Sequence, residues 1–148
     1  MSRETGGEPR LLFPALTGFY NTVSNLWYPM VRITVGASLY THAWPKFQSG
    51  PAAVAASMAK LGFVPGTFFA YAAMFLETVG ATCIIVGLFT RFFAAALAIE
   101  MALICFVVML PQGYQRMELP LIWGIVLFGI ALRGGGPYSL DRVIGTEL

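Results

Sequence analysis

Long apolar runs separated by polar breaks dominate the sequence. The runs cover residues 27–44, 63–90, 92–110 and 119–132. The first three are long enough to cross a hydrocarbon core of about 30 Å as helices. The fourth has only 14 residues, so it must extend through residues 117 and 118 or lie in a protein-lined dip. The pattern predicts an all-α membrane protein with transmembrane helices near residues 23–44, 64–89, 91–110 and 117–133.

The lengths of the breaks indicate how these helices are connected. Arg91 stands almost alone between the second and third runs, whereas residues 45–66 form a longer loop with a possible short interfacial helix over 52–60. Short connections favour antiparallel neighbours, so we expect an up-down-up-down four-helix bundle. Residues 1–22 are then a cytoplasmic or interfacial lead-in, residues 23–141 the membrane domain and residues 142–148 a tail.

Composition supports the same class. Hydrophobic residues make up 57% of the 148 residues and charged residues 11%, which is far outside the range of soluble domains. The nine basic residues are scattered rather than clustered, so we expect no nucleic-acid partner. The single histidine and the two separated cysteines match no metal, haem or disulfide motif, so we expect neither a metal site nor a covalent cofactor.

The basic residues also predict an orientation in the lipid bilayer. Arg3, Arg10, Arg91, Arg133 and Arg142 lie on the side of the termini, and Lys46, Lys60 and Arg116 lie on the other side. Cytoplasmic segments carry an excess of Lys and Arg, so this count of five against three predicts cytoplasmic termini.

Three ionisable residues interrupt the apolar runs near their middles, namely Arg32, Glu77 and Glu100. A charge at the bilayer centre costs ~3 kcal/mol, so such residues normally face the protein interior and find partners. Counting 1.5 Å per residue from the turn near residue 90 and from residue 44 places all three at one depth. We therefore expect a shared cluster in which one carboxyl group is protonated. An equally supported alternative is that these charges only fix the helix register.

A second polar set is expected nearer the outer surface. Lys46 shares a helix face with Arg32, and His42 lies at the edge of that face. Counting from Arg133 places Glu118 inside the outer leaflet. Together these residues predict a polar path leading to the central cluster. Simpler interpretations remain, because His42 can be an interfacial helix-end residue and Lys46 a snorkelling anchor.

The motifs form one ordered series along the chain. They are Arg32-x3-Gly36, His42-x3-Lys46, Leu61-Gly62, Glu77-x2-Gly80-x6-Gly87-x2-Thr90-Arg91, Glu100-Met101, Glu118 and residues 134–141, GGGPYSLD. This series resembles the DoxX family of small four-helix inner-membrane proteins over roughly residues 26–141. Family members often carry His-Gly where this chain has His42-Ala43, a departure expected to tighten packing without removing the histidine.

The resemblance implies a bacterial inner (plasma) membrane protein similar to the small membrane subunits of thiosulfate:quinone oxidoreductase. It also implies that residues 138–141 close the bundle on the cytoplasmic side. The polar positions that carry over are Arg32, His42, Lys46, Glu77, Arg91, Glu100 and Glu118.

The leading functional hypothesis is a subunit that holds a quinone or a similar amphipathic ligand in an intrabundle polar cavity. It has no redox cofactor of its own, so a protein partner in a redox complex supplies the electrons. The hypothesis assigns a proton relay to His42, Glu77, Glu100 and Glu118, and ligand binding to Arg32, His42, Lys46 and Glu118.

Two other classes of function stay open from the sequence. The first is a non-catalytic scaffold or assembly partner of a redox complex, with the charges as structural glue. The second is a proton-coupled carrier, which is less favoured because 148 residues hold no second repeat half unless the protein forms a homo-oligomer.

Overall fold

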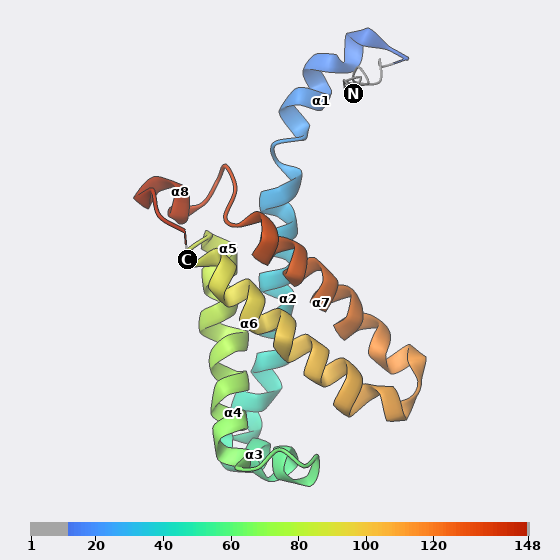
Figure 1. The fold of residues 1–148 in the computed structure, drawn as a ribbon, viewed down its shortest axis with the longest axis vertical. Helices are drawn as coiled ribbons and strands as arrows, with labels where there is room; N and C mark the ends of the chain where they lie inside the picture. The colour runs from blue at the N-terminus through green and yellow to red at the C-terminus, as the bar shows by residue number, and fades with distance from the viewer. Residues whose placement is uncertain (1–11, 148) are drawn as a thin grey trace, which may run out of the picture.

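The computed structural model describes residues 12–147 and shows them as helices joined by short turns (Figure 1). No strand occurs within these residues. The α-helices are α1 (Thr17–Val23), α2 (Trp27–Ser49), α3 (Pro51–Lys60), α4 (Gly66–Phe75), α5 (Ala81–Val86), α6 (Thr90–Leu103), α7 (Tyr114–Arg133) and α8 (Leu140–Ile144). Two π turns, Leu76–Gly80 and Ile104–Met109, and two 3-10 turns, Pro14–Leu16 and Leu110–Gln112, continue or precede them.

Three helical segments of the described chain are long and apolar enough to cross a membrane. They are Gly66–Val86, Thr90–Gln112 and Tyr114–Arg133, each continuous through any π or 3-10 turn that it contains. These segments confirm three of the four predicted spans. The first predicted span corresponds to α2, whose 23 residues reach about 35 Å but include both Arg32 and Lys46.

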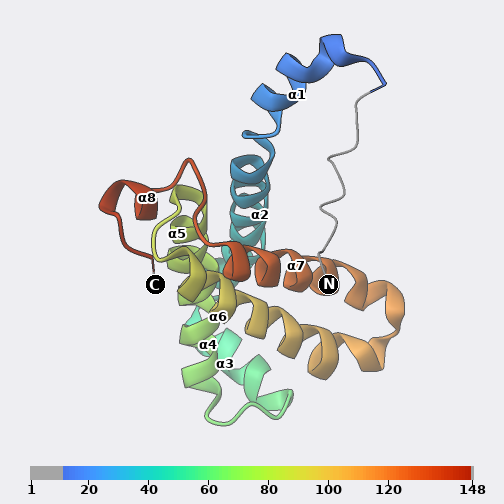
Figure 2. The same cartoon turned by 45° about the horizontal axis from the view of Figure 1, so that its top comes forward.

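The helices form two antiparallel pairs that cross obliquely. α2 runs beside the segment from α4 to α5, and α6 runs beside α7, as both views show (Figures 1 and 2). Apolar side chains from both pairs fill the core between them, including Leu39, Ile84, Leu97 and Leu127. We call the end that carries α8 the terminal end and the opposite end, where α3 lies, the α3 end (Figure 1).

The buried face of α2 follows helical spacing. Tyr28, Arg32, Gly36, Leu39 and Ala43 are all buried. Lys46, which was expected on the same face as Arg32, is partly buried, and His42 at its edge is exposed. A Cβ at Gly36 would lie 2.5 Å from Cγ1 of Ile85 and 2.9 Å from the backbone oxygen of Ala81. α2 therefore approaches α5 closely only because this position has no side chain.

Two helix boundaries differ from the predicted ones, at the end of α2 and at the start of α7. α2 continues through Pro45 to Ser49, and α7 begins at Tyr114 and continues through Pro120. α7 thus has 20 residues, about 30 Å, and needs no inward dip. The short helix expected over 52–60 is confirmed as α3. The predicted tail after residue 141 includes most of α8.

Candidate functional site

A buried ion pair links α2 to the first π turn. Nζ of Lys46 lies 2.5 Å from Oε1 of Glu77. The Glu77 side chain is 2% exposed and that of Lys46 is 23% exposed, so the long lysine stem reaches inward from a partly exposed position. The charge of Glu77 is therefore compensated by Lys46, which the sequence placed at the outer surface.

Glu77 belongs to a π turn rather than to a regular α-helix. The π turn Leu76–Gly80 lies between α4 and α5, and a second π turn, Ile104–Met109, follows α6. Such wide turns are rare and frequently occur at functional sites. Both turns contribute residues to one cavity, which makes the cavity the first candidate site.

This cavity, which we call the α2–α4–α6 cavity, has a volume of 410 Å³. Apolar side chains from α3, α4, α6 and the π turns form most of its wall, among them Met58, Phe63, Phe69, Ile99 and Val108. Within residues 12–147, the ionisable residues that line it are His42, Lys46, Glu77 and Glu100. The cavity thus combines an apolar wall with a few polar groups, as small-molecule sites commonly do.

Three of the four carboxyl oxygens in this cavity have no partner within the described residues. Both side-chain oxygens of Glu100 and Oε2 of Glu77 are buried without a hydrogen bond to any residue of the described chain. An unsatisfied buried polar group costs roughly 1–3 kcal/mol, more if it is charged. The site is therefore incomplete without a proton, a water or a ligand at these oxygens.

His42 lies on the wall of the same cavity. Its ring meets Trp123 of α7 edge to face, with the ring centroids 5.2 Å apart. This contact is one of the few between α2 and α7. The structure therefore brings together four of the six predicted site residues, namely His42, Lys46, Glu77 and Glu100.

Arg32 does not belong to this group, so the predicted cluster of Arg32, Glu77 and Glu100 is wrong. Arg32 is buried near the terminal end, where its Nη2 donates to the backbone oxygen of Tyr138 and its guanidinium lies 5.8 Å from the ring centre of Tyr28. The depth count took residue 44 as the end of the helix, whereas α2 continues to Ser49. At 1.5 Å per residue, Arg32 and Lys46 are about 21 Å apart along α2, so they lie at different depths.

Glu118 also lies outside the cavity. It is exposed on the second turn of α7, and α7 contributes no residue to the cavity wall. The predicted polar path therefore does not include Glu118. A 3-10 turn and the start of α7 occupy the segment before it. The residues that close the cavity instead come from α3 and the loop after it, including Leu61 and Phe63.

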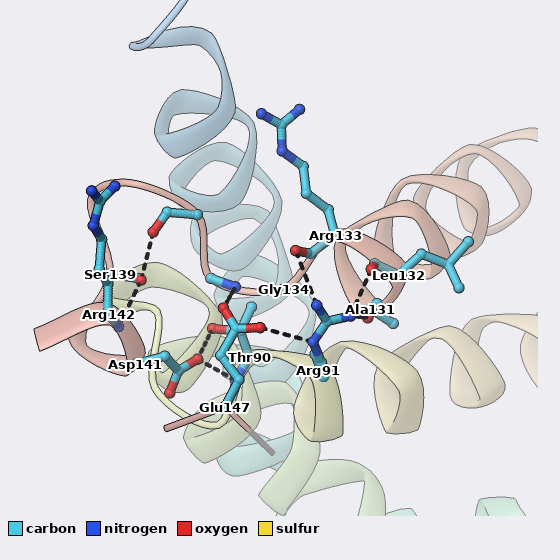
Figure 3. Close-up of polar contacts among 12 residues, drawn as sticks. Thr90, Arg91, Ala131, Leu132, Arg133, Gly134, Ser139, Asp141, Arg142 and Glu147 are labelled. Atoms are coloured by element: carbon cyan, nitrogen blue, oxygen red, sulfur yellow. Dashed lines mark hydrogen bonds and ion pairs between the residues drawn. The ribbon is translucent and has the colours of Figure 1, made fainter. Parts of the chain in front are cut away.

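A polar cluster at the terminal end was only partly anticipated. Asp141 accepts three hydrogen bonds. Its Oδ1 accepts from the backbone N–H of Phe89 at 2.7 Å. Its Oδ2 accepts from the backbone N–H and hydroxyl of Thr90 at 3.0 and 2.6 Å (Figure 3). These donors belong to the start of α6, so Asp141 caps that helix. Asp141 thus gives residues 138–141 a contact that closes this end of the bundle. The sequence alone did not identify Phe89 and Thr90 as its partners.

Arg91 ties the same end of the molecule to α7. Its guanidinium donates to the backbone oxygens of Ala131 and Leu132 at 3.1 and 2.6 Å, and it pairs with Glu147 at 2.8 Å (Figure 3). The carbonyls at the end of α7 have no partners within the helix, so Arg91 supplies them. Arg91 thus holds two helices together and does not reach the α2–α4–α6 cavity.

A second hollow of 640 Å³ lies between α6 and α7. Its wall is apolar except for Arg91 and includes small residues such as Ala95, Ala98 and Gly124. No carboxyl group lines it, which separates it chemically from the α2–α4–α6 cavity. Among residues 12–147, no group of three or more His, Cys, Asp or Glu side chains lies close enough together to hold a metal.

Comparison with known proteins places this chain in a family. No curated protein and no solved structure matches it. The DoxX family model matches residues 29–110, which is more than half of the chain. The matched range contains all four ionisable residues of the cavity. The chain therefore belongs to the DoxX family.

Proposed function

We propose that this protein is a membrane subunit that binds a quinone or a similar amphipathic ligand in the α2–α4–α6 cavity and supports a quinone-linked oxidoreductase. The observation that carries the proposal is the combination of an apolar wall with unpartnered carboxyl oxygens. A volume of 410 Å³ lies within the usual range of ligand pockets, about 300–1,000 Å³. The apolar wall suits a ring and its tail, and the polar residues suit a head group.

The chemistry of quinones fits these residues. A quinone accepts two electrons and two protons on reduction, so its site needs a supply of protons as well as electrons. Glu77, Glu100 and His42 are the proton-exchanging groups of the cavity, and Lys46 pairs with Glu77. We assign the relay and the ligand contacts to these four residues, without Arg32 and Glu118. The proposal assigns the supply of electrons to a protein partner.

We also propose that α2 crosses the membrane as a fourth span and that the protein lies in a bacterial inner membrane. α2 reaches about 35 Å and runs beside the apolar segment Gly66–Val86, and its two charged side chains find partners inside the protein. A bacterial inner membrane with cytoplasmic termini agrees with the five-to-three distribution of basic residues.

The test is the lipid content of the protein after gentle purification. The full chain is extracted in a mild detergent, and bound quinone is quantified per protein by solvent extraction and mass spectrometry. Ala96→Phe fills the α2–α4–α6 cavity, whereas Ala95→Phe places the same side chain in the hollow between α6 and α7. We expect Ala96→Phe to lose at least tenfold of the bound quinone and Ala95→Phe to retain it. Wild-type protein that carries no quinone and cannot be loaded with any would instead favour the scaffold.

A further inference from the structure

The buried side-chain atoms of the cavity that lack a partner within residues 12–147 are all carboxyl oxygens, which are acceptors when ionised. Glu77 and Glu100 together present four carboxyl oxygens, and Oε1 of Glu77 is the one with a partner in this part of the chain. The side-chain donors on the cavity wall belong to His42 and to Lys46, which uses one of its three N–H groups on Glu77 and is partly exposed. Three buried oxygens thus remain for a ligand to satisfy.

The structure points to a particular head group, and this inference rests on the proposed function. We propose that the cavity prefers a ligand whose head group donates hydrogen bonds through neutral hydroxyls, such as a hydroquinone, over one whose head group only accepts them, such as a quinone. A carbonyl oxygen brings no proton to an unpartnered carboxyl oxygen, whereas a phenolic O–H does. The hydroquinone therefore removes an unsatisfied group at each contact that it makes.

The preference does not depend on the protonation of Glu100. An ionised Glu100 offers two acceptors, and Glu77 adds a third. A protonated Glu100 donates through one oxygen but still accepts through the other, so two acceptors remain beside one donor. A hydroxyl both donates and accepts and suits either state. A quinone carbonyl can accept from Lys46 or His42 but leaves the carboxyl acceptors without a donor.

Charge distinguishes a hydroxyl from a cationic donor. Lys46 already places one ammonium beside Glu77. A second ammonium in a cavity with an apolar wall would meet a like charge at low dielectric and lose its hydration. While Glu100 is protonated, the cavity therefore favours a neutral donor over an alkylamine of the same length.

Preference for the reduced ring changes the redox balance of the bound ligand. A site that binds the reduced form tenfold more tightly than the oxidised form raises the two-electron potential of the bound pair by about 30 mV. Binding by the α2–α4–α6 cavity would thus favour reduction of the ring and retention of its reduced form.

The test is a series of ligands that differ only in donor capacity. The probes are a decyl hydroquinone, its monomethyl ether, its dimethyl ether, the matching decyl quinone and decylamine. Each is titrated under anaerobic conditions into the purified full chain in detergent, and dissociation constants are measured by calorimetry. We expect each lost hydroxyl to weaken binding about tenfold, which corresponds to one hydrogen bond of about 1.4 kcal/mol. The quinone and the dimethyl ether should bind similarly weakly.

Two variants assign the effect to a residue. Glu100→Gln replaces one acceptor oxygen by an N–H donor, so the ratio of quinone to hydroquinone dissociation constants should fall at least tenfold. Glu118→Gln makes the same chemical change on an exposed turn of α7 and should leave the ratio unchanged.

The outcomes separate this inference from the function on which it rests. Equal binding of quinone and hydroquinone, or tightest binding of decylamine, overturns the donor preference while leaving a ligand site in the cavity. Absence of binding by every probe, with no effect of Ala96→Phe on bound lipid, overturns both.

Discussion

Lys46 on α2 and Glu77 on the first π turn form an ion pair at 2.5 Å, although 31 positions separate them in the sequence. The pair is asymmetric, because the carboxylate is fully enclosed while the ammonium keeps some access to the surroundings. Removing the lysine therefore leaves a buried carboxylate without its counter-charge, which costs more than leaving the partly exposed ammonium unpaired.

The first prediction follows from this asymmetry. Lys46→Met should lower the free energy of unfolding by about 2 kcal/mol, because Glu77 loses its partner. The double variant Lys46→Met, Glu77→Leu should return to within about 1 kcal/mol of wild type, because no buried charge remains. Unfolding by sodium dodecyl sulfate in mixed micelles measures both. Equal loss in the single and double variants would show that the pair is not the cause.

The second prediction concerns Arg32 and Glu77, which the structure places at different levels of α2. Arg32→Leu removes the donor to Tyr138 and should destabilise the protein by about 2 kcal/mol. Because the two residues share no partner, the effects of Arg32→Leu and Glu77→Gln should add within about 0.5 kcal/mol. If one substitution partly rescued the other, the result would instead support the shared cluster expected from the sequence.

The third prediction uses two glycines. Gly87 ends α5 at φ +72°, and a Cβ there would lie 2.0 Å from Nη1 of Arg32 and 2.5 Å from Cβ of Ser139. Gly87→Ala should cost about 2 kcal/mol or more, through the left-handed backbone and the clash. Gly129→Ala on α7, with nothing within 4 Å, should be neutral or stabilise by up to about 1 kcal/mol. Thermal unfolding of both variants checks the contrast.

The fourth prediction concerns the cap of α6. Asp141→Ala leaves the N–H groups of Phe89 and Thr90 without their acceptor, so we expect a loss of about 1–3 kcal/mol. Hydrogen exchange should increase first at the start of α6. Arg142→Ala, one residue along α8, changes an exposed side chain and serves as the control. Unchanged exchange at residues 89 and 90 in Asp141→Ala would contradict the capping role.

The fifth prediction is the orientation. Ala56 is exposed on α3, so Ala56→Cys on intact cells should react with a membrane-impermeant thiol reagent if the termini are cytoplasmic. The native Cys83 and Cys105 are buried and should contribute little background. Labelling of a cysteine introduced at position 142, with no labelling at position 56, would show the opposite orientation.

Hydrophobic periodicity in the sequence determined the helical class, three apolar spans and the short helix after residue 50. It also indicated the buried face of α2, because residues three and four apart share a helix face whatever that face contacts. The ionisable residues that line the cavity were visible as polar interruptions of apolar runs, which are costly in a membrane wherever they lie.

Only the tertiary structure decided which of these residues meet. Depth along a helix depends on where the helix ends, and α2 passes through Pro45 to Ser49 instead of ending at residue 44. That extension pairs Lys46 with Glu77 and leaves Arg32 with the backbone of Tyr138. Which helix faces the cavity is likewise set by contacts between distant segments: α7 packs against α6, so Glu118 stays outside.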